Sequence, residues 1–278
     1  MTPASFLQCG GHRLDLTRPR VMGVVNATPD SFSDGGRYLD PAQAIAHARQ
    51  LVADGADIVD VGGESTRPGA DEVSAAAECA RVLPVVRALA LDGAIVSVDT
   101  SKPEVIRAAV DAGASMINDV RALRVAGALD AAAASGAAVC LMHMKGDPRT
   151  MQQAPQYADV VADVREFLAE RIDAARAAGI PAERIAVDPG FGFGKTLEHN
   201  VAVMRGLPAL AALGYPVVVG YSRKSSLGAI TGRGPHDRLA ASLAAALVAI
   251  ARGARIVRVH DVRETVDALA VWTLMQAQ

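Results

Sequence analysis

The residues best suited to chemistry in this chain stand at the ends of eight short apolar runs. Each run ends in a carboxylate, amide, hydroxyl, imidazole or cationic side chain. In chain order these residues are Asn26, Asp60, Glu64, Asp99, Asn118, Asp119, His143, Asp188, Ser222 to Lys224, Arg258, His260 and Asp261. Such a recurrence indicates an enzyme site that is assembled from the ends of many strands.

Asp99, Asn118 and Asp188 form one chemical group. An ionised carboxylate accepts two parallel hydrogen bonds, so two acids and an amide around one opening suit a ring-shaped ligand with adjacent N–H donors. A structural role competes with this one, because such a carboxylate can also cap the next helix or accept backbone N–H bonds. The turn signature Pro189-Gly190 gives that alternative weight at Asp188. The three residues together favour ligand binding.

Lys224, Arg258 and His260 form a second group, which is cationic or polar. Lys224 follows the seventh apolar run, and the loops after strands seven and eight of a (β/α)8 barrel commonly bind phosphate with the help of a helix N-terminus. Arg258 and His260 occupy alternate positions, so both side chains point to the same side, toward the lumen or the mouth. The group is compatible with a small anionic ligand.

The glycine cluster GFGFGKT over 190–196 resembles a phosphate-binding loop but fits neither known pattern. A Walker A loop would need Gly at Pro189, and the GxGxxG fingerprint would need Gly at Lys195. We interpret the segment as a tight strand-to-helix turn in which Phe193 could form a wall for a flat ligand. His143 has no second His or Cys at zinc-ligand spacing. Mg²⁺ would need only one Asn or Asp near a diphosphate.

The elements that must position these residues alternate between strand and helix. The predicted strands are 21–25, 57–61, 94–98, 115–119, 138–142, 184–187, 216–220 and 255–259. Ala-rich stretches with helical spacing lie between most of them. The pattern predicts a single α/β domain over residues 1–278, a (β/α)8 TIM barrel.

Several helix boundaries follow from local signals. A first helix is expected from Pro41 with Asp40 as its cap, and another after Ser101 with Pro103 early in it. Two longer helices are predicted over about 157–178 and over 262–276. In the sixth helix, the sequence Gly206-Leu207-Pro208 predicts an interruption.

The two ends of the chain carry further features. Residues 1–18 are predicted to form an N-terminal β-hairpin around Gly10-Gly11, which could plug the N-terminal mouth of the barrel. The segment 238–252 is apolar nearly all round and must be buried by its own domain or by a partner subunit. We favour a homodimer contact on 238–276.

Composition narrows the class of protein. The chain is 51% hydrophobic but only 4% aromatic, which suits parallel strands buried on both faces. A net charge of −2 argues against nucleic-acid binding. Cys9, Cys79 and Cys140 are widely spaced and are expected to be free thiols in a reducing compartment. No signal peptide or membrane span is recognised, so we expect a cytoplasmic protein without a membrane partner.

Eight segments, in order along nearly the whole chain, resemble the bacterial dihydropteroate synthases, a family of pterin-binding barrel enzymes. The segments are VMGVVNATPDSFSDGG (21–36), DVGGESTRPGA (60–70), SVDT (97–100), INDV (117–120), LMHMKGDPRTMQ (141–152), DPGFGFGKT (188–196), GYSRKSSLG (220–228) and RVHDV (258–262). The resemblance implies a reaction that joins p-aminobenzoate to 6-hydroxymethyl-7,8-dihydropterin diphosphate, giving 7,8-dihydropteroate and diphosphate.

The resemblance also implies roles for individual residues. The pterin would be bound by Asp99, Asn118, Asp188, Lys224, Met142 and Phe193. The diphosphate and p-aminobenzoate would be bound by Asn26, Thr66, Arg67, Pro68, Ser222, Arg258, His260 and Phe32. Catalysis would rest on Asn26, Arg258, His260, Lys224 and Asp99, with Mg²⁺ on Asn26.

Two long loops, two main alternative functions and a weaker third complete the expectations. The loops 27–40 and 63–71, which include Asp34 and Arg67, are expected to close over the departing diphosphate, although long surface loops would look similar. One alternative is a folate-dependent methyl-transfer module, which would share the Asp and Asn pocket. The other is a non-catalytic pterin-binding protein. A generic phosphate-binding aldolase or isomerase fits less well.

Overall fold

Eight parallel strands form the centre of the computed structural model, which describes residues 4–27, 41–65, 72–146, 151 and 155–276. The strands are β3 (Arg20–Asn26), β4 (Ile58–Gly62), β5 (Val96–Asp99), β6 (Met116–Asp119), β7 (Ala138–Met142), β8 (Ile185–Asp188), β9 (Val218–Val219) and β10 (Ile256–Val259). Their order in the sheet is β8-β7-β6-β5-β4-β3-β10-β9. A parallel bridge between Val187 and Val217 joins the two ends of this order, so the sheet closes into the predicted barrel.

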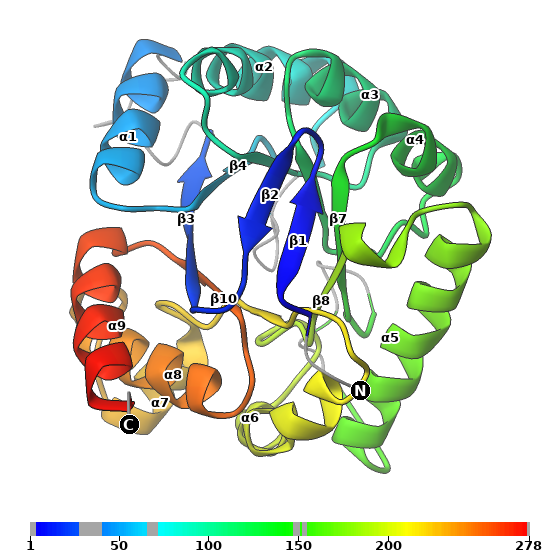
Figure 1. The fold of residues 1–278 in the computed structure, drawn as a ribbon. Coiled ribbons are helices and arrows are strands. Elements are labelled where there is room, and N and C mark those ends of the chain that lie inside the picture. Colours follow the sequence, from blue (N-terminus) through cyan, green and yellow to red (C-terminus); the bar gives the residue numbers. More distant parts are fainter. Residues whose placement is uncertain (1–3, 28–40, 66–71, 147–150, 152–154, 277–278) are drawn as a thin grey trace.

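Helices surround the barrel (Figure 1). They are α1 (Pro41–Ala53), α2 (Ala75–Leu91), α3 (Pro103–Asp111), α4 (Ala128–Ser135), α5 (Val160–Ala177), α6 (Leu197–Ala211), α7 (Ser225–Thr231), α8 (Leu239–Ala251) and α9 (Val262–Gln276). Two short 3-10 turns, η1 (Ala182–Arg184) and η2 (Pro235–Asp237), precede β8 and α8. The last helix has the predicted bounds.

Local capping explains where several helices begin. The side chain of Asp159 accepts hydrogen bonds from the backbone N–H groups of Val161 and Ala162, so α5 begins at Val160 rather than near 157. Thr196 and His199 form a capping box at the start of α6. Pro103 opens α3 as predicted. The predicted cap of α1, Asp40, lies outside the described residues.

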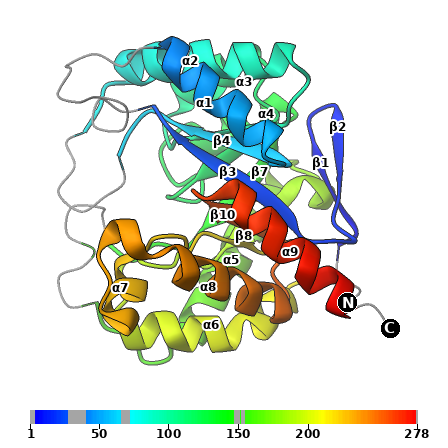
Figure 2. The ribbon, with the colours of Figure 1, turned by 90° about the vertical axis from the view of Figure 1, so that its left-hand side faces the viewer.

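A β-hairpin of β1 (Phe6–Cys9) and β2 (His12–Asp15) covers the N-terminal end of the barrel (Figure 2), as predicted. Its buried side chains, Leu7, Cys9, Leu14 and Leu16, pack in one cluster with inward-facing residues from the starts of the barrel strands. Those strand residues are Met22, Ile58, Met116, Ala138, Cys140, Ala186, Val218 and Ile256. The hairpin therefore closes the lumen opposite the end at which the parallel strands finish.

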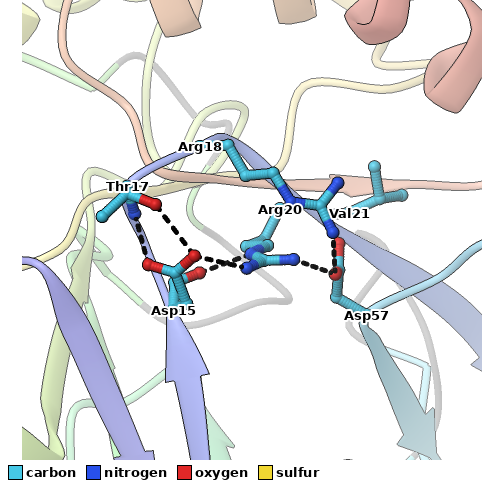
Figure 3. A network of polar contacts seen from close by, with 6 residues as sticks. All are labelled: Asp15, Thr17, Arg18, Arg20, Val21 and Asp57. Atoms are coloured by element: carbon cyan, nitrogen blue, oxygen red, sulfur yellow. Dashed lines mark hydrogen bonds and ion pairs between the residues drawn. The ribbon is translucent and has the colours of Figure 1, made fainter.

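A polar network fastens this hairpin to the barrel (Figure 3). The guanidinium of Arg20, only 8% exposed, donates to Asp15 of the hairpin at 3.1 Å and to Asp57 before β4 at 2.8 Å. The second oxygen of Asp57 accepts the backbone N–H of Val21 at 2.9 Å. Because each buried charge has a partner, the network fixes the hairpin without leaving an uncompensated ion.

The expected interruption of the sixth helix is wrong. The helix α6 runs through Gly206 and Pro208 to Ala211. A Cβ on Gly206 would lie 2.7 Å from both methyl groups of Val161 on α5, so glycine serves the close approach of two helices. Pro208 lies near the C-terminal end of α6, so its ring and its missing N–H disturb few hydrogen bonds of the helix.

The three cysteines are free thiols, as predicted, and Cys140 is fully buried core. Burial raises the pKa of the Cys140 thiol well above its ordinary value, which suits a packing role. Across the described part of the chain, none of the helices has the length and apolar character needed to cross a membrane.

Candidate active site

A cavity opens at the C-terminal ends of the barrel strands. It is lined by Asp99, Asn118, Val120, Met142, Asp188, Gly190, Phe191, Phe193, Gly220, Lys224 and Arg258. All six residues that the resemblance assigned to the pterin are in this wall. The strand register explains the grouping: Asp99 pairs with Asn118, and Met142 pairs with Asp188. The strand ends that carry the chemistry therefore meet at one level of the barrel.

Arg258, which lines this cavity, binds two carboxylates. Its Nε donates to Oδ2 of Asp60 at 2.6 Å, and its Nη2 donates to Oδ2 of Asp99 at 2.9 Å. Burial alone would lower the pKa of Arg258, but the two carboxylates outweigh it and raise this pKa. Burial also raises the pKa of Asp99 to about 7, against the opposing effect of Arg258.

Asp60 does not itself line the cavity but binds Arg258, which does, and the sequence alone gave Asp60 no role. Its side chain is fully buried, and its Oδ2 also accepts from Nδ2 of Asn118 at 3.1 Å. Within the described residues, its other oxygen has no hydrogen-bond partner. The signal was present, because a carboxylate within the apolar run 58–62 must point inward or be paired.

Asp188 accepts a hydrogen bond from the turn that follows it and also lines the cavity. Its Oδ1 accepts the backbone N–H of Gly190 at 2.7 Å, which is the structural role that its turn signature favoured. Its Oδ2 lies beside Gly220, another residue of the cavity wall. Burial raises the pKa of Asp188, while the Gly190 bond and the charges of Lys224 and Arg258 lower it.

Lys224 precedes α7 and lies in the wall of the same cavity as these acids. Its Nζ lies 4.3 Å from the ring centroid of Phe193, a cation–π contact. The turn before it contains Arg223 at φ 57°, whose guanidinium is paired with Asp261 after β10. The loops after β9 and β10 are thus joined by an ion pair that fixes the turn leading to Lys224.

His260 and Ser222 lie together beside the cavity. The Nδ1 of His260 is 3.1 Å from the hydroxyl of Ser222, and the backbone N–H of His260 donates to the same oxygen at 3.3 Å. Burial and the nearby charge of Arg258 lower the pKa of His260 to about 4. The imidazole is therefore neutral at pH 7 and offers a hydrogen bond rather than a charge.

The GFGFGKT segment is a tight strand-to-helix turn, as predicted. Gly190, Gly192 and Gly194 all have positive φ, of 70°, 79° and 65°. A Cβ on Gly190 would lie 1.8 Å from the carbonyl oxygen of His143, so the turn requires glycine where it approaches β7. Lys195 of this turn is buried and bonds His143, a contact that the sequence did not reveal.

Among the remaining predicted residues, Asn26 lies just before a segment outside the described residues, and the others lie within such segments. Asn26 ends β3, half-buried, next to Gly62 of β4. Thr66, Arg67, Pro68, Phe32 and Asp34 lie outside the described residues, as do most of the two predicted lid loops. The two sides of the second loop are joined, because Glu64 accepts the backbone N–H of Val73 at 2.9 Å.

The described residues contain no group of three or more His, Cys, Asp or Glu side chains that could hold a metal ion. Asn26, the residue to which the resemblance assigned Mg²⁺, carries an amide oxygen at the end of β3. An amide oxygen suits a hard cation such as Mg²⁺, which takes most of its other ligands from phosphate and water.

Comparisons with known proteins agree with this geometry. The family model of the pterin binding enzymes matches residues 22–260. The dihydropteroate synthase of Escherichia coli (strain K12) is 52% identical over 262 residues, covering 94% of this chain and 93% of the relative.

Solved structures agree over almost the whole length. The Xanthomonas albilineans dihydropteroate synthase with 4-aminobenzoic acid has a TM-score of 0.93 at 55% identity and covers 99% of both chains. The same enzyme in complex with 7,8-dihydropteroate has a TM-score of 0.90 at 52% identity, covering 98% of this chain and 99% of that one.

Proposed function

Since the chain belongs to the dihydropteroate synthase family of pterin binding enzymes, we propose that it joins p-aminobenzoate to 6-hydroxymethyl-7,8-dihydropterin diphosphate. The products are 7,8-dihydropteroate and diphosphate. One observation carries the proposal: Asp99, Asn118, Asp188 and Lys224 line a single cavity at the C-terminal ends of the strands. Active sites of such barrels lie at this end.

The cavity has the chemistry to bind a pterin. The amino-pyrimidine edge of a pterin carries adjacent N–H donors, which the carboxylate of Asp188 would accept in parallel. Asn118 and Asp99 would complete the polar edge, and Lys224 would donate to the ring carbonyl. Met142 and Phe193 are buried in the same wall and would pack against the faces of the flat ring.

Departure of the diphosphate is the step that needs charge stabilisation. When the bond between the pterin methylene and the diphosphate oxygen breaks, the electron pair leaves with the diphosphate and negative charge develops there. Arg258 would take this charge together with hydrogen bonds from His260 and Ser222, whose neutral pair lies next to it.

The amine attack needs no protein nucleophile. The electron-rich dihydropterin bears the positive charge left on its methylene, and the amine nitrogen of p-aminobenzoate then bonds to that carbon and loses a proton. Thr66, Arg67, Pro68 and Phe32 would surround the p-aminobenzoate. Closure of their loops would exclude water from the cation, which water would otherwise consume.

We propose Mg²⁺ as the cofactor, held by Asn26 and the diphosphate. When bound, it would neutralise the charge that grows on the leaving group. The proposal rests on the chemistry of Asn26, whose amide oxygen at the end of β3 is a ligand type that Mg²⁺ accepts.

We also propose a homodimer and a reducing, cytoplasmic setting. Large apolar side chains remain exposed on α8 and α9: Leu239, Val248, Val271, Leu274 and Met275. These two helices pack against each other, so a second copy could cover both. The free thiols support the reducing compartment.

The proposed activity is tested by incubating the purified chain with both substrates and Mg²⁺. We expect equal amounts of diphosphate and 7,8-dihydropteroate to accumulate. A folded protein that binds the pterin but forms no product would instead be a binding module. A methyl-transfer module would bind the pterin yet leave p-aminobenzoate unchanged.

A further inference from the structure

Lys195 is a buried lysine for which the proposed reaction has no use. Its side chain is in the turn after β8, behind the cavity wall, and the residue is only 3% exposed. Its Nζ lies 2.9 Å from Nδ1 of His143, 2.9 Å from the carbonyl oxygen of Gly190 and 3.2 Å from that of Phe193. A lysine ammonium has three N–H donors, so these three acceptors satisfy all of them.

This geometry determines the form of His143. If Lys195 donates to Nδ1, the imidazole is neutral and carries its proton on Nε2. The surroundings agree, since burial first and the charge of Lys195 second lower the pKa of His143 to about 3. Burial lowers the pKa of Lys195 itself to about 7, against the opposing effect of the Asp188 carboxylate.

The partners of Lys195 are parts of the pterin cavity. Gly190 and Phe193 both line the cavity, and the backbone N–H of Gly190 is the donor to Asp188. His143 follows β7, and its own backbone N–H donates to the carbonyl oxygen of Asp188 at 2.9 Å. The buried amine of Lys195 thus joins the end of β7 to the 190–194 turn. This turn carries Phe193 of the cavity wall and Gly190, whose backbone N–H donates to Asp188.

Lys195 also acts on Asp188 through its charge. Burial raises the pKa of Asp188, and the charges of Lys224, Arg258 and Lys195 oppose this rise. Lys224 and Arg258 face the cavity, where a ligand would approach them. Lys195 lies behind the wall, where its three hydrogen-bond partners are His143, Gly190 and Phe193.

We propose that Lys195 is a positioning residue of the pterin site, which holds the 190–194 turn against β7 and places its amine behind Asp188. The inference rests on the proposed function, because it assigns the pterin to this cavity. It adds a residue that does not touch the ligand to the set that decides how tightly the pterin binds.

The test compares three variants by calorimetry with 6-hydroxymethylpterin between pH 5 and pH 8. Lys195→Met removes the donor and the charge, Lys195→Arg keeps the charge, and Lys145→Met removes a lysine of the neighbouring turn that does not line the cavity. We expect Lys195→Met to bind roughly tenfold to a hundredfold more weakly, because three buried acceptors lose their donor. Lys145→Met should bind like the unmodified chain.

The pH profile separates positioning from mere destabilisation. Without the positive charge of Lys195, the pKa of Asp188 should rise, so Asp188 is protonated at a higher pH. As the pH falls, Lys195→Met should therefore begin to lose the pterin at a higher pH than the unmodified chain. Lys195→Arg should keep the original acid limb. In turnover, the KM for the pterin diphosphate should rise more than kcat falls. A loss of affinity that is equal at every pH and in both Lys195 variants would overturn the proposal.

Two further outcomes distinguish a failure of this inference from a failure of the proposed function. If the unmodified chain does not bind the pterin, the proposed function fails, and this inference fails with it. If Lys195→Met does not fold, nitrogen-15 NMR of the unmodified chain decides, because it reports the tautomer of His143. A proton on Nε2 with Nδ1 bare supports the proposal, and a proton on Nδ1 overturns it.

Discussion

At the scale of residues, the acids of this site combine structural and ligand-binding roles within one side chain. Asp188 uses one oxygen for the turn that follows β8, and its second oxygen lies beside the cavity wall at Gly220. Asp99 shares Arg258 with the fully buried Asp60. The two interpretations of a strand-end carboxylate are therefore compatible, because a carboxylate has two oxygens and four lone-pair sites.

Replacement of Asp188 by Asn tests this division. In Asp188→Asn, the amide oxygen can still accept from Gly190, but the amide NH₂ would face the N–H donors of the pterin. We expect pterin affinity to fall roughly tenfold to a hundredfold, since a charged acceptor is lost and a donor opposes donors. Calorimetry with 6-hydroxymethylpterin measures this, with the exposed Asp111→Asn as control. Equal affinities in the two variants would refute the assignment.

The buried histidines predict how stability depends on pH. The pKa of His143 falls from 6.5 to about 3 and that of His260 to about 4, both chiefly through burial. The folded state therefore disfavours their protonated forms, and the unfolded chain binds the extra protons. Each contribution is fully present above pH 6.5 and is lost as the pH falls toward the folded-state pKa.

Denaturant unfolding at several pH values measures this loss. Between pH 6.5 and about pH 4, each histidine should remove about 1.4 kcal/mol of unfolding free energy per pH unit. In His143→Gln, one of the two titrating groups is gone, so the slope should be smaller than in the unmodified chain. Identical slopes would mean that His143 does not titrate in the expected way.

At the scale of elements, close backbone approach decides features that local propensity misjudged. Gly206 and Pro208 predicted a break in the sixth helix, but the close contact with Val161 on α5 makes glycine necessary there. In the turn after β8, Gly190 is required for a similar reason. Helix propensity is a weak local preference, and packing between neighbouring elements overrides it.

The N-terminal hairpin is expected to be part of the core rather than an appendage. Leu7 is fully buried in the cluster that closes the lumen, whereas Leu91 at the end of α2 is 88% exposed. Leu7→Ala should lower the free energy of unfolding by roughly 2–5 kcal/mol, the usual effect of removing a buried leucine. Leu91→Ala should change it by less than about 0.5 kcal/mol. Equal, small effects in urea denaturation would show that the hairpin packs only loosely.

At the scale of the whole molecule, the two ends of the barrel have different tasks. The hairpin, held by Arg20 between Asp15 and Asp57, closes the N-terminal end with apolar side chains. The C-terminal end carries the cavity and the charged residues. Stability and chemistry are thus separated along the barrel axis, as in other barrels of this kind.

The exposed apolar side chains of α8 and α9 predict the oligomeric state. Leu274 is 73% exposed and Val271 is 59% exposed on the last helix. Light scattering at micromolar protein should give the mass of a dimer, and Leu274→Lys should shift it toward the monomer of 28.7 kDa. Leu91→Lys, on a helix at another part of the barrel, should leave the dimer intact. A monomeric unmodified chain would reject the contact.

The sequence by itself determined the fold and most of the site. Alternating strands and helices predicted the barrel, and the strand 138–142 and helix 262–276 have the predicted bounds. The polar strand ends predicted the charged and amide residues that line the cavity, because all parallel strands of a closed barrel finish at one rim. These residues are Asp99, Asn118, Asp188, Lys224 and Arg258. Periodicity and position along a strand carry this information locally, so it can be read without a structure.

Only the tertiary structure decided which residues pair with each other across that rim. Asp60 and Arg258 are 198 residues apart, and Lys195 and His143 are 52 residues apart, yet each pair is in direct hydrogen-bond contact. The lengths of the separate elements and the register of the strands set such contacts, and no local pattern records them. The physical reason is burial: inside the barrel, a charge must find a partner, and the fold determines which one lies within reach.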